Sequence, residues 1–96
     1  MLPINRVICG DSLSIMGDMP CGCVDMVLID PPFNLGKDYG KETDDRLPES
    51  EYLEWYTGMA ERVYRVHAGG YAYVFVSTPQ IWTVRPIWEK VGYEWV

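Results

Sequence analysis

The sequence has few of the residues that build metal sites or covalent cross-links. It contains three cysteines and one histidine in 96 residues. Cys9, Cys21 and Cys23 lack the paired C-x-x-C spacing of zinc ligands, and His67 lies far from them in the chain. An odd number of cysteines is also a poor basis for a disulfide framework. We therefore predict neither a bound metal nor a disulfide.

Long apolar stretches are missing as well. The longest runs, residues 26–29 and 72–76, are far shorter than the roughly 20 residues that cross a bilayer. The first residues lack the basic segment followed by an apolar one that marks an export signal. These absences favour a cytoplasmic protein without a membrane partner.

Positive charge is scarce. The chain has 8 Lys and Arg against 14 Asp and Glu, which gives a formal net charge of -6. A protein that holds nucleic acid through a broad face needs clustered Lys and Arg to neutralise the phosphates. Any binding to nucleic acid therefore requires positive surface from elsewhere. A length of 96 residues suffices for one hydrophobic core, so we expect a single domain over residues 1–96.

What the sequence does contain is an alternation of short apolar runs with longer segments of helical periodicity, which is typical of α/β layering. We predict strands at 5–9, 24–29, 71–77 and 93–96, and helices at 13–16, 49–67 and 78–91. Pro86 conflicts with the last helix, and its ring should kink or split that segment. Residues 31–47 are predicted to form a long loop, a type that is usually functional or disordered.

The strand at 24–29 is almost continuously apolar, as a parallel strand covered by helices on both faces requires. Asp30 follows at its carboxyl end, where open α/β sheets bind their ligands. We refer to Asp30, Pro31, Pro32 and Phe33 as the Asp-Pro-Pro-Phe turn.

The Asp-Pro-Pro-Phe turn combines groups that could hold a planar amine. Asp30 offers a carboxylate acceptor, and Pro31 offers a carbonyl without a competing N–H. Consecutive prolines fix the turn, and Phe33 provides a flat stacking surface. The alternative is a stiff turn that only ends the strand, with Phe33 folded back into the core.

Two further features favour a ligand site. A Gly-Asp-Ser segment containing Asp11 and Ser12 ends the first predicted strand, so that a second carboxylate would face the same edge of the sheet. A polar loop that holds Asn34 and Lys37 follows the Asp-Pro-Pro-Phe turn directly. The two acidic strand ends therefore flank one predicted cleft.

These motifs resemble a known family. The Asp-Pro-Pro-Phe turn matches the catalytic motif of the amino-group DNA methyltransferases, which act on N6 of adenine or N4 of cytosine and carry Asp-Pro-Pro followed by Tyr, Phe or Trp. The Gly-Asp-Ser segment, about twenty residues earlier, is most similar to the permuted group, in which the catalytic half precedes the glycine motif for the cofactor. The resemblance covers essentially the whole chain, although outside these motifs it is one of pattern.

The resemblance implies a fold, a reaction and a set of roles. The fold is a partial class I, Rossmann-like methyltransferase fold that uses S-adenosylmethionine. The reaction is methyl transfer to N6 of an adenine flipped out of double-stranded DNA, with N4 of cytosine as the alternative and no metal. The implied roles are catalysis by Asp30, Pro31, Pro32 and Phe33, cofactor binding by Asp11 and Ser12, and substrate binding by Asn34 and Lys37.

The chain departs from this family in one respect: no G-x-G loop follows a strand. We therefore expect an N-terminal catalytic half that lacks the recognition region and is inactive alone. Methyltransferases of ribosomal RNA and of protein glutamine place their glycine motif upstream, and only 29 residues precede Asp30, too few for two strands and their crossovers. A small α/β interaction module without catalytic activity is the remaining alternative.

Overall fold

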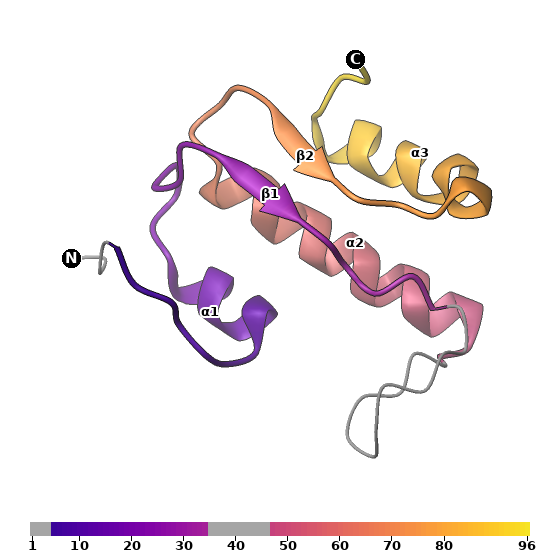
Figure 1. The fold of residues 1–96 in the computed structure, drawn as a ribbon, viewed down its shortest axis with the longest axis horizontal. Coiled ribbons are helices and arrows are strands. Elements are labelled where there is room, and N and C mark those ends of the chain that lie inside the picture. Colours follow the sequence, from indigo (N-terminus) through magenta and orange to yellow (C-terminus); the bar gives the residue numbers. More distant parts are fainter. Residues whose placement is uncertain (1–4, 35–46) are drawn as a thin grey trace.

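The computed structural model of the protein describes residues 5–34 and 47–96. Two short parallel strands, β1 (Val27–Ile29) and β2 (Ala72–Val74), are connected through the long helix α2 (Glu49–Val66). The register places Leu28 opposite Tyr73. Figure 1 looks onto the two strands, with α2 running behind them. The predicted α/β class with a parallel sheet is therefore confirmed, with a sheet of two strands in the described residues.

Helix α2 forms because its sequence places suitable charges at both ends and apolar side chains along one face. Acidic Glu49 and Glu51 lie in the first turn and Arg65 in the last, which suits the helix dipole. Its buried residues recur at helical spacing: Tyr52, Tyr56, Met59, Ala60, Val63 and Val66. The predicted helix at 49–67 is confirmed to within one residue.

Helix α3 (Ile81–Val91) follows a short 3-10 turn, η1 (Thr78–Gln80). We predicted that Pro86 kinks or splits this segment. The helix runs without a break through Pro86, so the predicted split is wrong, and the kink stays a prediction. The missing N–H of Pro86 would have bonded to the carbonyl of Trp82. Pro86 itself is exposed, so it lies on the side of the helix that faces solvent. The helix ends at Gly92, whose φ of 134° suits glycine.

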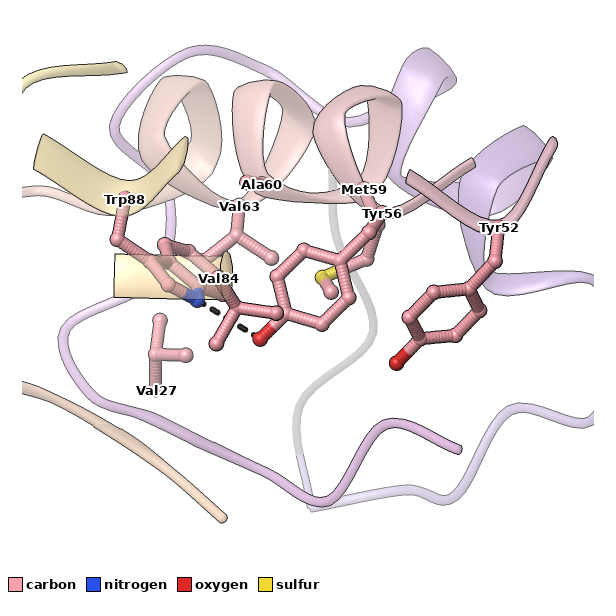
Figure 2. Close-up of a cluster of buried hydrophobic side chains, with 8 residues drawn as sticks. All are labelled: Val27, Tyr52, Tyr56, Met59, Ala60, Val63, Val84 and Trp88. Carbon is pink, nitrogen blue, oxygen red and sulfur yellow. Dashed lines mark hydrogen bonds between the residues drawn. The ribbon is translucent and has the colours of Figure 1, made fainter. Parts of the chain in front are cut away.

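The core lies between α2, α3 and one face of the sheet (Figure 2). Tyr56 and Trp88 are both buried, and the indole Nε1 of Trp88 donates a 2.8 Å hydrogen bond to the Tyr56 hydroxyl. Their rings meet edge to face with centroids 5.8 Å apart, a favoured aromatic geometry. Val27 of β1 and Val84 of α3 complete the contact between sheet and helices.

Helix α1 (Ser12–Asp18) packs against α2. Leu13 and Met16 lie against the core, and the guanidinium of Arg65 donates to the carbonyl of Met16 at 2.5 Å. The helical turns predicted at 13–16 are therefore confirmed. None of the helices in the described part of the chain has the length and apolar character needed to span a membrane.

The predicted strands are the least accurate part of the sequence analysis. Residues 5–9 and 93–96 form no strand, and those predicted at 24–29 and 71–77 are reduced to three residues each. A strand needs a partner to satisfy its N–H and C=O groups, and the described ranges offer none for these segments. Val7 is accordingly 100% exposed, whereas Tyr93 packs its ring on Tyr64.

The Tyr56–Trp88 hydrogen bond generates a stability prediction. Tyr56→Phe leaves the buried indole N–H of Trp88 without its acceptor, so we expect the free energy of unfolding to fall by about 1–3 kcal/mol. Tyr71→Phe is the matched control because Tyr71 is exposed. Urea denaturation measures the free energy of unfolding of both variants. Equal losses in the two would show that the Tyr56–Trp88 hydrogen bond does not stabilise the fold.

Burial of two tyrosine hydroxyls also makes the free energy of unfolding depend on pH in the alkaline range. Desolvation raises the pKa of Tyr56 to about 12, and burial raises the pKa of Tyr93 in the same direction. An unfolded chain ionises tyrosine near pH 10, so the stabilisation is complete below pH 10 and declines between pH 10 and 12. We expect the unfolding free energy to fall less steeply with pH in Tyr56→Phe than in the parent chain. Identical slopes would refute this effect.

Candidate functional site

The Asp-Pro-Pro-Phe turn begins where strand pairing ends. The Phe75 N–H donates to the Ile29 carbonyl at 3.0 Å, and the chain then leaves the sheet at Asp30. Asp30 is exposed, whereas Pro31 is buried. The structure thus places the Asp30 carboxylate in solvent at the carboxyl end of β1, at the edge that the sequence predicted.

Phe33 does not belong to the core. It is half-buried and lies outside the cluster of side chains packed between the sheet and the helices. The alternative in which the turn serves only to return Phe33 to the core is therefore not supported. Phe33 is thus partly accessible to solvent.

Two side chains from other elements hold the backbone of the turn. The hydroxyl of Tyr52 on α2 donates to the Pro32 carbonyl at 2.5 Å, and Tyr52 is only 4% exposed, so its position is fixed by packing. The Gln80 amide on η1 donates to the carbonyl of Phe33. Consecutive carbonyls of the turn are therefore bound from two directions.

Neither Tyr52 nor Gln80 was identified from the sequence. Tyr52 belongs to the apolar stripe of α2, so its pattern predicts packing alone. Gln80 follows β2 closely, and the carboxyl ends of parallel strands meet at one edge. The meeting of strand ends at one edge was therefore the signal that could have identified Gln80. The sequence contains no comparable signal for the hydrogen bond made by Tyr52.

Asn34 ties the turn to the start of α2. Its side-chain amide donates to the Leu47 carbonyl at 2.8 Å, and its carbonyl oxygen accepts from the Leu47 N–H at 2.7 Å. Its φ of 57° lies in the left-handed region, which asparagine tolerates better than most residues. The amide predicted to bind substrate is thus engaged with the backbone of Leu47. Lys37, the other predicted substrate ligand, lies outside the described residues.

Asp11 and Ser12 lie at a different place from the turn. The Asp11 carboxylate caps α1, accepting from the N–H of Ser14 at 3.2 Å and from its hydroxyl at 3.0 Å. Ser12 is the first residue of α1, and both predicted cofactor ligands are exposed. Figure 1 shows α1 on the opposite side of β1 from β2. The strand that would carry Asp11 to the sheet edge is not formed.

A groove of about 340 Å³ opens beside the turn. It is lined by the residue after the turn, by the end of the segment before α2, and by residues of α2, η1 and α3: Asn34, Leu47, Glu49, Tyr52, Leu53, Pro79, Gln80, Thr83 and Val84. Phe33 directly precedes the lining residue Asn34 in the chain, but neither Asp30 nor Phe33 lines the groove. A larger hollow of about 490 Å³ lies between α2 and α3, away from the turn. Within residues 5–34 and 47–96, no cluster of His, Cys, Asp and Glu could hold a metal ion.

The fold and the turn define an α/β domain with an acidic site at the carboxyl edge of a parallel sheet. The sequence profile of the DNA methylase family N6_N4_Mtase matches residues 24–96. The chain therefore belongs to this family, as its motifs suggested. The matched region contains the complete Asp-Pro-Pro-Phe turn together with Tyr52 and Gln80, whose side chains bind its carbonyls.

Curated relatives agree with this family. Type II methyltransferase M.HpaI of Haemophilus parainfluenzae is 36% identical over 90% of the chain and 27% of its own length. M.BglII of Bacillus subtilis is 36% identical over 66% of the chain and 16% of its own length. M.BamHI of Bacillus amyloliquefaciens is 33% identical over 75% of the chain and 17% of its own length. The chain thus spans between a sixth and just over a quarter of these relatives. No solved structure matches the chain significantly.

The two hydrogen bonds between the Asn34 side chain and the Leu47 backbone, which we call the Asn34–Leu47 clamp, can be tested directly. Asn34→Ala removes both hydrogen bonds and places a less tolerant residue in the left-handed region, so we expect a loss of about 1–3 kcal/mol in the free energy of unfolding. Asn34→Gly is the matched control because it removes the bonds while accepting the positive φ. Amide hydrogen exchange at Leu47 should quicken in both variants. Unchanged exchange would show that the clamp is not formed.

Proposed function

We propose that residues 1–96 are the catalytic half of a DNA methyltransferase domain that methylates N6 of a flipped adenine, with N4 of cytosine as the second candidate. The observation that carries this proposal is the exposed Asp30 carboxylate at the carboxyl end of β1, on a turn whose carbonyls are bound by Tyr52 and Gln80. Membership of the DNA methylase family supports it. The proposed fold of the complete domain is Rossmann-like, with further strands beside β1 and β2.

The chemistry requires activation of an amine. The exocyclic nitrogen of adenine is a poor nucleophile because its lone pair is delocalised into the ring. Hydrogen bonds from its two hydrogens to the Asp30 carboxylate and the Pro31 carbonyl favour a tetrahedral nitrogen with a localised lone pair. Fixed acceptors also stabilise the positive charge that develops on the nitrogen. The anchoring of the turn supports this role because preorganisation limits the reorganisation needed during the reaction.

Phe33 supplies the second proposed contact. Because it is half-buried and outside the core, its ring can stack on a base that has left the duplex. Stacking of a base on an aromatic ring contributes roughly 1–3 kcal/mol, which offsets part of the cost of unstacking. Pro32 contributes by holding the turn rigid, with its carbonyl directed to Tyr52.

The methyl donor implied by the family is S-adenosylmethionine, and the structure does not bring the two predicted donor ligands to the groove beside the turn. One oxygen of the Asp11 carboxylate, Oδ2, accepts from Ser14, and neither Asp11 nor Ser12 lines the groove beside the turn. The proposal that Asp11 and Ser12 contact the donor therefore depends on chain beyond these residues.

The proposed nucleic-acid partner is double-stranded DNA. A net charge of -6 repels phosphate, so the positive surface that holds the duplex must come from a recognition region outside residues 1–96. Asn34 and Lys37 are proposed to act near the base, with Asn34 also anchored to Leu47.

The role of Asp30 is tested in a chimeric enzyme in which this chain replaces the matching segment of M.HpaI. We expect Asp30→Ala to lower kcat/KM for methyl transfer to DNA by at least about 100-fold. Asp25→Ala is the matched control, since Asp25 is an equally charged and exposed residue beside the same strand. Mass spectrometry of the product nucleosides distinguishes N6-methyladenine from N4-methylcytosine. Full activity in Asp30→Ala would overturn the mechanism.

A further inference from the structure

The hydroxyl of Ser77 is an exception among the polar groups that follow β2. Its Oγ is buried and has no hydrogen-bond partner within the described residues. A buried hydroxyl without a partner loses its hydrogen bonds to water and gains none in return. Such groups are rare in native proteins, and each one calls for an explanation. His67 Nε2 shares this property but lies after α2 and before β2, so Ser77 is the one at the edge that carries Asp30.

The local sequence explains why the Ser77 side chain does not cap the 3-10 turn η1. Ser77 is the N-cap residue of η1, where a serine normally accepts from the N–H of the second or third residue. The second residue is Pro79, which has no N–H. The third is Gln80, whose N–H donates to the Ser77 carbonyl at 3.0 Å. The Ser77 hydroxyl therefore receives no hydrogen bond from the turn that it precedes.

The alternation along β2 places Ser77 on the side of the sheet away from the helices. Side chains alternate between the two faces of a strand. Val74 and Val76 pack against the core, and Phe75 between them is exposed. The backbone of Ser77 is still extended, with φ of -77° and ψ of 149°. Ser77 therefore continues the face of Phe75.

Asp30 reaches the same face from β1. Ile29 packs against the core and Leu28 is exposed, so Asp30 continues the face of Leu28. The last register pair joins Ile29 and Val74. Asp30 follows this pair by one residue and Ser77 by three, and both strands point to the same edge (Figure 1). A diagonal pair two residues out of register has its Cα atoms about 8 Å apart, a distance that an aspartate, a serine and one hydrogen bond together span.

The Asp30 carboxylate needs a contact of this kind. Tyr52 and Gln80 bind the carbonyls of Pro32 and Phe33, which fixes the backbone of the turn but leaves the Asp30 side chain free to change its rotamer in solvent. Productive alignment with a reacting nitrogen requires that the carboxylate keep one orientation.

We propose that Ser77 is a positioning residue of the methyl-acceptor site. Its hydroxyl donates a hydrogen bond to one oxygen of the Asp30 carboxylate and thereby directs the other oxygen to the amine of the base. Because the hydroxyl is covered from solvent, its partner is a neighbouring side chain that rotates toward it. A hydrogen bond to an ionised acceptor is stronger than one between neutral groups. The inference rests on the role proposed for Asp30.

The chimeric enzyme, in which this chain replaces the matching segment of M.HpaI, tests the proposal. Ser77→Ala should lower kcat by at least about 10-fold while KM for DNA changes by less than about 2-fold. Ser77→Thr keeps a hydroxyl and should retain most of the activity. Thr78→Ala is the matched control because it removes an exposed hydroxyl one residue further on, and it should leave kcat unchanged.

Stability separates this role from a structural one. Removing a buried hydroxyl that has no partner should leave the urea midpoint of the 96-residue chain unchanged or raise it. Ser77→Ala is therefore expected to lower activity without lowering stability. A clearly lower midpoint would show that the hydroxyl already bonds within the fold, and the proposal would then be wrong.

A double-mutant cycle in the chimeric enzyme distinguishes failure of this inference from failure of the proposed function. In an Asp30→Ala background, Ser77→Ala should have no further effect on kcat because its partner is gone. Equal losses in both backgrounds, or full activity of Ser77→Ala beside an impaired Asp30→Ala, would overturn the inference and leave the role of Asp30 intact. Full activity of Asp30→Ala would overturn both.

Discussion

The parallel pairing of β1 and β2 is the constraint on which the rest of the structure depends. It forces the intervening chain to cross over as α2, whose buried face then becomes half of the core. It also brings residues 30–34 and 77–80 to one edge of the sheet, although they are far apart in sequence. Without this pairing, Gln80 could not reach the carbonyl of Phe33.

The site combines an accessible carboxylate with a backbone that is held in place. Asp30 is exposed, yet the residues that follow it are bound to α2 through Tyr52, to η1 through Gln80 and to residue 47 through Asn34. Such a division of roles suits a group that must meet a substrate in one orientation. The proposed activation of an exocyclic amine uses this arrangement directly.

The sequence predicted the elements with strong local signals and missed those that depend on partners. α2 followed from its apolar stripe, and the location of Asp30 followed from the apolar run before it. The strands at 5–9 and 93–96 were wrong because a strand is stabilised by its neighbours. The predicted split of α3 at Pro86 was wrong because this exposed position tolerates the lost hydrogen bond. The anchoring by Tyr52 and Gln80 could not be predicted because it arises only when distant segments meet.

The central claim concerns where Asp30 lies relative to the reacting nitrogen. The most direct measurement is a crystal structure of the chimeric methylase, in which this chain replaces the matching segment of M.HpaI, bound to duplex DNA containing the target base. The account predicts that the base is out of the stack, on Phe33, with its exocyclic nitrogen about 2.6–3.2 Å from an Asp30 carboxylate oxygen. A flipped base held elsewhere, with Asp30 directed to solvent, would contradict it.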